Sequence, residues 1–213
     1  DYVIIANPDI HVTPRCIRRV KDALDKTQGA VAASARVKDP QGGELFSYWT
    51  LLPLWKDLLD TGLVTRRLFK AMLNTPSYRL AYAGDEDCRL VDAVPGSFFM
   101  LKTGLLTPGE IKEVFDKHIF LYYEEKVLGQ KFRKMGLKTV LVTDESYVHA
   151  HSVSIDKSFK RIVDKQRLLH RSKLYYYKEY LGTGPAGMAA ARAVLGLVLA
   201  EVWFLTVVCR MRW

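Results

Sequence analysis

Cysteine is scarce in this sequence of 213 residues. The three cysteines, Cys16, Cys88 and Cys209, lie far apart, and none belongs to a Cys-x-x-Cys pair. A disulfide framework and a zinc ribbon are therefore excluded, because both need an even set or a close spacing of cysteines. The scarcity favours a reducing compartment.

Acidic residues are the second shortage. The chain has 23 Asp and Glu against 32 Lys and Arg, which gives a formal net charge of +9. This excess favours an anionic partner: a nucleic acid, an acidic membrane or a phosphorylated substrate. Hydrophobic residues make up 49% of the sequence and charged residues 26%, a balance that permits a globular core and argues against wholesale disorder.

The first residues predict a strand that ends in a carboxylate. Residues 2–6 form an apolar run rich in β-branched side chains, typical of a strand covered on both faces of a parallel sheet. Asn7-Pro8 then ends the strand, because proline lacks a backbone donor and restricts the residue before it. Asp9 would lie at the carboxyl end of the strand, where open α/β sheets bind ligands and a carboxylate can hold a divalent ion. The alternative is an ordinary turn residue.

Strand and helix signals alternate through the next part of the chain. Thr13-Pro14 is a typical helix start, and Gly29 lies where that helix should end. Thr107 and Glu110 have the spacing of a capping box before a second helix. Further strands are expected at residues 30–37, 90–94, 98–102 and 139–142. The alternation predicts an α/β fold with a sheet flanked by helices.

Two adjacent acids, Glu124 and Glu125, begin another predicted helix. A helix N-terminus favours carboxylates electrostatically, and two neighbouring side chains point in different directions. One of them can therefore face a cleft and act as a general base towards a hydroxyl. The plainer interpretation is a pair of acids that only stabilises the start of the helix.

Two histidines, His149 and His151, follow the strand predicted at 139–142 and a turn. Residues two apart on an extended segment share a face, and a neutral imidazole can ligate a metal. A structural role in the core or on the surface is the alternative.

The order of these motifs resembles glycosyltransferase family 2, over roughly residues 1–180. Its bacterial rhamnosyltransferases, which build surface polysaccharides, are the most similar members. The stretches that carry the resemblance are Asn7-Pro8-Asp9, Val94 to Lys102, Phe115 to Glu125, Gly136 and His149 to Ser154.

The resemblance implies a GT-A fold with a mixed, mainly parallel sheet, an inverting mechanism and a nucleotide-sugar donor held through Mn²⁺ or Mg²⁺. Asn7 and Asp9 fall on the Asp-x-Asp element of the family, with Asp9 as the carboxylate that faces the metal. His149 falls on a histidine that completes the metal site in some members. Asn7 replaces the first acid of the element, so weaker metal affinity is expected.

The resemblance also assigns the remaining site residues. Gly96 and Ser97 fall where the family lines the pocket for the donor sugar and the acceptor. Glu125 falls on the second acid of a Glu-Asp pair, the general base, with Glu124 as its neighbour. Glutamate in place of the commoner aspartate moves the carboxylate outward by about one methylene.

The family's nucleotide pocket comes from strands that precede the metal motif. A chain that begins directly with a core strand is therefore expected to lack sequence upstream, since a parallel strand needs neighbours. We expect such a chain to hold part of the site and to have weak activity or none by itself.

The C-terminal third predicts contact with a membrane. Eight basic residues from Lys157 to Lys178 alternate with apolar ones, as in a cationic amphipathic helix that binds anionic lipids. The alternative is a solvated helix packed on the catalytic domain. Residues 189–209 are almost wholly apolar and long enough to span a bilayer. Arg192 and Glu201 would lie on opposite faces of that helix, which favours a membrane-associated or self-associating helix over a span.

Three segments follow: a catalytic part at 1–155, a basic amphipathic segment at 156–181 and an apolar helix at 182–213. The leading hypothesis is a glycosyltransferase with a lipid-linked or polysaccharide acceptor, at the cytoplasmic face of a bacterial inner membrane. A metal-dependent phosphoesterase is the alternative enzyme. A nucleic-acid-binding protein is less favoured, because no nucleic-acid motif is present.

Overall fold

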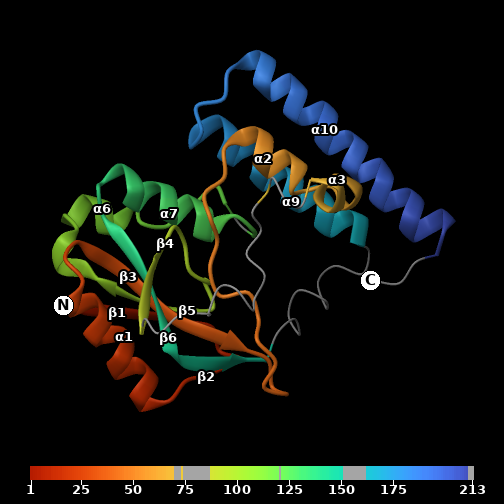
Figure 1. Cartoon of the computed structure of the whole chain (residues 1–213). Coiled ribbons are helices and arrows are strands. Elements are labelled where there is room, and N and C mark those ends of the chain that lie inside the picture. The colour runs from red at the N-terminus through yellow and green to blue at the C-terminus, as the bar shows by residue number, and fades with distance from the viewer. Residues whose placement is uncertain (70–72, 74–86, 120, 151–161, 211–213) are drawn as a thin grey trace. The chain divides into compact units, whose positions relative to one another are not determined.

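A computed structural model of the chain describes residues 1–69, 73, 87–119, 121–150 and 162–210 (Figure 1). The chain divides into two compact units. The sheet unit comprises residues 1–51, 76–118 and 124–152. The helical unit comprises residues 52–75, 119–123 and 153–213.

A mixed sheet forms the centre of the first unit. Its strands are β1 (Tyr2–Ala6), β2 (Ile10–His11), β3 (Ala30–Lys38), β4 (Cys88–Val91), β5 (Phe98–Lys102) and β6 (Lys138–His149). They run in the order β1-β5-β3-β6-β2. The remaining strand, β4, pairs with residues 139–142 of β6, whereas β2 pairs with residues 148 and 149. The unit also holds α1 (Pro14–Lys26), the short 3₁₀ helix η1 (Thr103–Leu105), α6 (Pro108–Lys112) and α7 (Glu124–Lys134).

The expected α/β fold with a helix-flanked mixed sheet is confirmed, but mainly parallel pairing is not. Among the described strands, only β3 and β6 pair in parallel, and the other pairings are antiparallel. The physical reason is that an apolar run reports burial and carries no information about strand direction. The expectation that β1 is covered on both faces is also wrong, because Val3 and Ile4 are 47% and 45% exposed.

Two hydrophobic clusters cover the two faces of the sheet. On one face α1 packs Cys16, Val20 and Leu24 against the sheet. On the other face α7 packs Leu128 and Phe132 against it. Successive residues of β5 alternate between the clusters, as expected of a strand between two helical layers.

The predicted helix starts are confirmed. The Thr13 side chain accepts a hydrogen bond from the backbone N–H of Cys16, and Pro14 is the first residue of α1. Thr107 and Glu110 form the expected capping box at α6. Gly29 and Gly136 follow α1 and α7 with φ of 77° and 71°, a backbone conformation that glycine adopts without steric cost.

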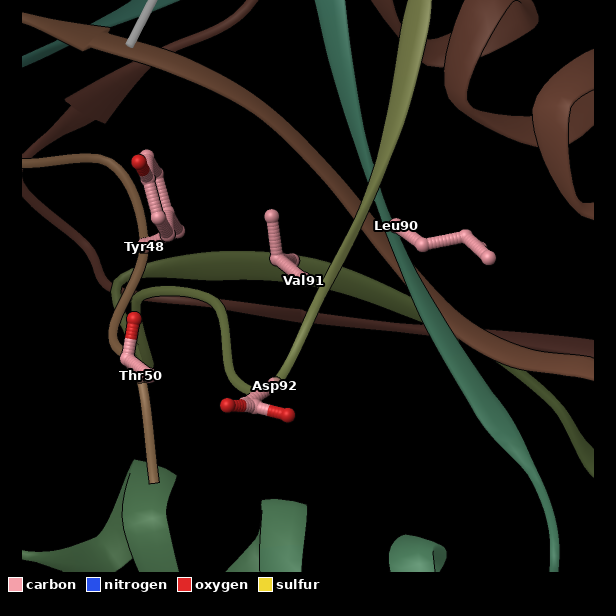
Figure 2. A pocket seen from close by; sticks show the side chains of 5 residues that line it. All are labelled: Tyr48, Thr50, Leu90, Val91 and Asp92. Atoms are coloured by element: carbon pink, nitrogen blue, oxygen red, sulfur yellow. The ribbon is translucent and has the colours of Figure 1, made fainter. Parts of the chain in front are cut away.

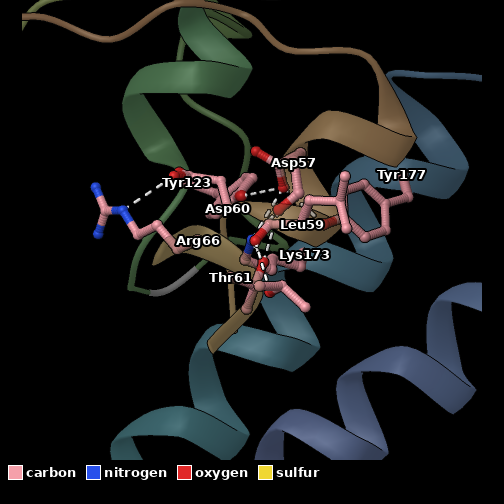
Figure 3. Close-up of polar contacts among 9 residues, drawn as sticks. Asp57, Leu59, Asp60, Thr61, Arg66, Tyr123, Lys173 and Tyr177 are labelled. Carbon is pink, nitrogen blue, oxygen red and sulfur yellow. Dashed lines mark hydrogen bonds and ion pairs between the residues drawn. The ribbon is translucent and has the colours of Figure 1, made fainter. Parts of the chain in front are cut away.

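The helical unit contains α2 (Leu54–Leu59), α3 (Leu63–Leu68), α9 (Ile162–Glu179), α10 (Pro185–Trp203) and the π-helix η2 (Phe204–Val208). Its polar centre is the buried carboxylate of Asp57 on α2 (Figure 3). Lys173 of α9 lies 2.9 Å from this carboxylate, and the hydroxyls of Tyr123 and Tyr177 donate to it. Burial, followed by the nearby Asp57 charge, raises the pKa of both tyrosines.

The basic segment is therefore only partly a surface feature. Residues 157–161 lie outside the described part of the chain, and Lys173 is buried against Asp57. Arg167, Arg171 and Lys178 of α9 are exposed. The burial of Lys173 could not be predicted from composition, because composition does not reveal that a distant acid packs against this helix.

One helix in the described part of the chain is long and apolar enough to cross a membrane, and it covers 24 residues from Pro185 to Val208. Glu201, the acid within it, accepts hydrogen bonds from the backbone N–H groups of Leu63 and Val64 at the start of α3. Glu201 is thus held inside the helical unit by the first turn of a neighbouring helix.

Candidate functional site

The corner formed by Asn7, Pro8 and Asp9 crosses the carboxyl edge of the sheet. It joins β1 to β2, which lie at opposite ends of the strand order. The backbone N–H of Asn7 donates to Ser97 O at 2.8 Å, just before β5, and the N–H of Ala150 donates to Asp9 O at 3.1 Å, just after β6. The corner therefore brings Asp9 over the strand ends, where α/β sheets bind their ligands.

Asp9 lies beside His149. Nε2 of His149 is 3.3 Å from Oδ1 of Asp9, and the two side chains are 13% and 33% exposed. The pairing of Ile10 with His149 between β2 and β6 fixes this proximity through the backbone. The prediction that these two residues lie together is thus supported by the strand register.

The donor atoms of this pair suit a divalent ion in part. Carboxylate oxygen and imidazole nitrogen are both ligands of Mn²⁺, and Mg²⁺ uses one or two carboxylates together with substrate phosphates. Among the described residues, no group of three or more His, Cys, Asp and Glu side chains gathers at one point. The third predicted ligand, His151, lies outside the described residues.

Glu125 lies on the first turn of α7 with its carboxylate against the backbone of Gly96. The N–H of Gly96 donates to Oε1 of Glu125 at 3.3 Å. A methyl group built on Gly96 would lie 3.4 Å from the same oxygen, so glycine leaves this side of the carboxylate open. The structure therefore joins two residues that are 29 positions apart and that the family resemblance assigns to the same site.

The environment of Glu125 changes its acidity. Burial, and then the neighbouring negative charge of Glu124, raises the pKa of Glu125 from 4.5 to about 7. The hydrogen bond from Gly96 and the charge of Lys126 act in the opposite direction and are smaller. The residue keeps partial contact with solvent. A carboxylate with a pKa near neutrality is suited to general-base chemistry.

Backbone strain immediately precedes these acids, and sequence reasoning did not find it. Tyr122 and Tyr123 have φ of 66° and 74°, in the left-handed region that side chains other than those of Gly, Asn and Asp rarely adopt. Such strain persists only where the surroundings hold it, and it is concentrated at functional sites. The double tyrosine gives no sequence signal for this conformation.

Ser97 has a buried partner that was not predicted, Tyr147 of β6. Their hydroxyl oxygens are 2.7 Å apart, and the ring of Tyr147 packs edge-on against Phe98. Burial raises the pKa of Tyr147, so this hydroxyl stays protonated and available as a donor. Tyr147 lies two residues before His149 on the same strand, and this period-two spacing is the signal that could have found it.

Two hollows in the described part of the sheet unit lie elsewhere. One of about 220 Å³ is lined by Tyr48, Thr50, Leu90, Val91 and Asp92 (Figure 2). It is smaller than an ordinary ligand pocket, for which about 300 Å³ is a lower bound. The Asp92 carboxylate is already bonded to the backbone N–H of Leu51 and to Arg133. We therefore place the candidate site at the Asp9 and Glu125 edge and not in this hollow.

Comparison with known proteins gives a distant relationship. No protein-family model matches the chain. Two proteins named N-acetylglucosaminyl-diphospho-decaprenol L-rhamnosyltransferase, from the CDC 1551 / Oshkosh and ATCC 25618 / H37Rv strains of Mycobacterium tuberculosis, are each 28% identical to it over 160 residues. The match covers 73% of this chain and 50% of each relative, so the chain spans about half the length of these relatives. The similarity supports a glycosyltransferase-like relationship.

Proposed function

We propose that this chain carries the acceptor-activating part of an inverting glycosyltransferase with a GT-A fold, of family 2. The observation that carries the proposal is Glu125, a half-buried residue whose carboxylate accepts from the Gly96 N–H and has its pKa raised to about 7 by burial. The Asp9–His149 pair is linked to the same region, because Asn7 bonds to the residue that follows Gly96. The distant similarity to a rhamnosyltransferase supports sugar transfer as the reaction.

Glu125 would act as the base. Its carboxylate takes the proton of an acceptor hydroxyl while the hydroxyl oxygen forms a bond to the anomeric carbon of the donor sugar. The bond from that carbon to the nucleotide diphosphate breaks on the opposite face, which inverts the configuration. A base is most effective when its pKa lies near the working pH, and such catalysis contributes on the order of 10²–10⁴ in rate. Glu124 serves by raising the pKa of Glu125.

Asp9 and His149, with His151 as a further candidate, would hold a divalent ion, Mn²⁺ or Mg²⁺. When bound, such an ion neutralises charge on diphosphate oxygens. Asn7, Gly96 and Ser97 would line the space for the donor sugar and the acceptor. The Asn7 N–H donates to the backbone carbonyl of Ser97, and the Ser97 hydroxyl lies 2.7 Å from that of Tyr147, so Ser97 is held in place for this proposed role.

The donor would be a nucleotide sugar, with rhamnose as the first candidate, because the relatives are named as L-rhamnosyltransferases. The acceptor would be a lipid-linked sugar or a growing polysaccharide, at the cytoplasmic face of a bacterial inner membrane. The relatives' name also includes a decaprenol-linked diphosphate sugar. We further propose that α10 supports membrane association or self-association.

A donor screen tests the proposal. The full-length protein is incubated with dTDP-rhamnose or a UDP-hexose, Mn²⁺ or Mg²⁺, and a polyprenyl-diphosphate-linked acceptor, and nucleotide diphosphate release is measured. The expected result is release that needs the acceptor and is accompanied by glycosylated lipid. Release at the same rate without any acceptor would instead indicate hydrolysis and would contradict sugar transfer.

A further inference from the structure

The outer side of α10 is apolar and exposed. The inner side buries Met188, Ala191, Leu195, Val198 and Val202 within the helical unit. The large exposed side chains of α10 and η2 are Leu197, Trp203, Phe204, Val207 and Val208. Leu197 alone is 72% exposed. Contiguous apolar surface of this kind marks a surface that binds a partner or a membrane.

The short helix α3 carries further exposed apolar side chains. Its N-terminus contacts α10, because Glu201 bonds to its first two backbone N–H groups and a methyl group on Gly62 would lie 3.2 Å from Val198 (Figure 1). Its apolar side chains face outward: Val64 is 56% and Leu68 is 73% exposed. We call the exposed apolar residues of α3, α10 and η2 the outer face of the helical unit.

The position of Glu201 determines whether α10 can cross a bilayer without losing its contact with α3. It is the seventeenth of the 24 residues from Pro185 to Val208, so a spanning α10 would place it about 24 Å along the helix and within the hydrocarbon layer. Its bonds would then carry α3 to the same depth, together with the exposed Arg66 and Arg67. Each charged side chain at the centre of a bilayer costs about 2.5–3.5 kcal/mol on the insertion scale. A span would therefore disrupt the α3 contact.

We propose that the outer face lies in the plane of an anionic membrane, with α3 and α10 at the interface and neither helix crossing it. In this orientation the apolar side chains enter the acyl boundary, and Glu201 stays bonded to α3. Four exposed arginines belong to or adjoin these helices: Arg67, Arg192 and Arg210 can reach anionic headgroups, and Arg66 is paired with Asp60. Trp55 and Trp203 are each 50% exposed, and tryptophan favours the headgroup level.

The arginines favour lipid over a second copy of the chain as the occupant. Two copies joined through this face would bring like charges together, whereas anionic headgroups neutralise them. The inference deepens the proposed function and rests on it in one respect, that a lipid-linked acceptor lies in the same interface.

The first test determines on which side of a vesicle membrane Cys209 lies. Of the three cysteines, Cys16 is buried, so a full-length Cys88→Ser variant leaves the exposed Cys209 as the reactive thiol of this chain. The protein is bound to sealed vesicles of phosphatidylcholine and phosphatidylglycerol in equal amounts and treated with a membrane-impermeant maleimide. We expect that the maleimide labels Cys209 without detergent. We also expect that alkaline carbonate releases the protein from the vesicles. Labelling that needs detergent, with resistance to carbonate, would establish a span and overturn the proposal.

Charge substitutions provide the second test. Leu68→Glu and Leu197→Glu should each weaken binding to these vesicles by about tenfold, a loss of about 1.4 kcal/mol. Leu90→Glu is the matched control, since Leu90 is 56% exposed on β4 of the sheet unit, and it should bind as the parent does. Unchanged binding by Leu197→Glu would refute the proposal. If the parent forms a dimer and does not bind vesicles, and if Leu197→Glu dissociates that dimer, then the outer face binds a second copy of the chain and the proposal is wrong.

The labelling and vesicle-binding tests do not depend on catalytic activity. Vesicle binding that persists while the donor screen fails would count against the proposed function alone. Sugar transfer to a lipid-linked acceptor without any binding to vesicles would count against the interfacial face alone.

Discussion

Lys173 Nζ lies 2.9 Å from Asp57 Oδ2, and the two side chains are only 6% and 1% exposed. The pair joins α2 to α9, although the residues are 116 positions apart. Tyr177 donates to the same carboxylate oxygen at 2.6 Å, and the hydroxyl of Thr61 also contacts Lys173. A buried charge with this many partners fixes the relative position of the helices that supply them.

Lys173→Met is expected to destabilise the helical unit strongly. Removing one partner of a buried ion pair leaves the other charge uncompensated, which costs about 3–5 kcal/mol. Urea unfolding of the full chain followed by circular dichroism measures the change. Lys178→Met is the control, because its side chain is on the same helix and 69% exposed. A loss within about 0.5 kcal/mol for Lys173→Met, the range of ordinary surface substitutions, would exclude the structural role of the pair.

Glu125→Gln is expected to lower the turnover of the proposed reaction by about 10²–10⁴. The amide keeps the size of the side chain and can still accept from the Gly96 N–H, but it cannot take a proton. Donor affinity, measured by calorimetry, should be unchanged, so the loss should be in kcat. Glu113→Gln, an exposed acid of the same unit, is the control. Unaltered turnover in Glu125→Gln would remove this residue from the mechanism.

The pH profile of the activity should report the environment of Glu125. A base with a pKa of about 7 is protonated at pH 5 and ionised at pH 8, so kcat/KM should rise with pH and level off above about 7. Glu124 raises this pKa by charge repulsion, so Glu124→Gln should move the midpoint to lower pH while the plateau activity persists. A midpoint that stays near 7 in Glu124→Gln would show that burial alone sets the acidity.

Asp9→Asn is expected to raise the Mn²⁺ concentration that gives half-maximal activity. The substitution removes the carboxylate charge of the proposed pair and leaves His149 in place. Direct binding of Mn²⁺, followed by electron paramagnetic resonance of the free ion, should weaken in parallel. Asp22→Asn, on the exposed side of α1, is the control. Equal Mn²⁺ affinity in the parent and in Asp9→Asn would exclude Asp9 as a ligand.

The sequence predicts those parts of the structure that depend on local chemistry. Thr13 and Thr107 cap helices as their spacing indicates, and the corner at Asn7 ends β1 where proline requires it. The proximity of Asp9 and His149 was also accessible, because the family order of motifs placed both at strand ends. These features depend on a few neighbouring residues, and tertiary packing did not override them.

Long-range pairing could not be predicted in the same way. The antiparallel direction of β5 depends on which strand it meets, and the burial of Lys173 depends on Asp57, an acid in a segment without clear periodicity. The partners of Glu201 could not be predicted for a similar reason. Hydropathy identifies it as a charge within an apolar helix, whereas the structure gives it two backbone donors from α3.

Gly129→Ala is expected to disturb the site through packing alone. Gly129 lies one turn after Glu125 on α7, and a methyl group there would come within 2.4 Å of the backbone oxygen of Asp92. Neither backbone can yield easily, so α7 should move away from the segment that leads to Gly96 and weaken the contact between Gly96 and Glu125. We expect a loss of about 1–3 kcal/mol in unfolding free energy, typical of overpacking, together with reduced kcat. Gly104→Ala, with open space around its Cβ, is the control. Parent-like stability and turnover in Gly129→Ala would show that this close approach does not position the base.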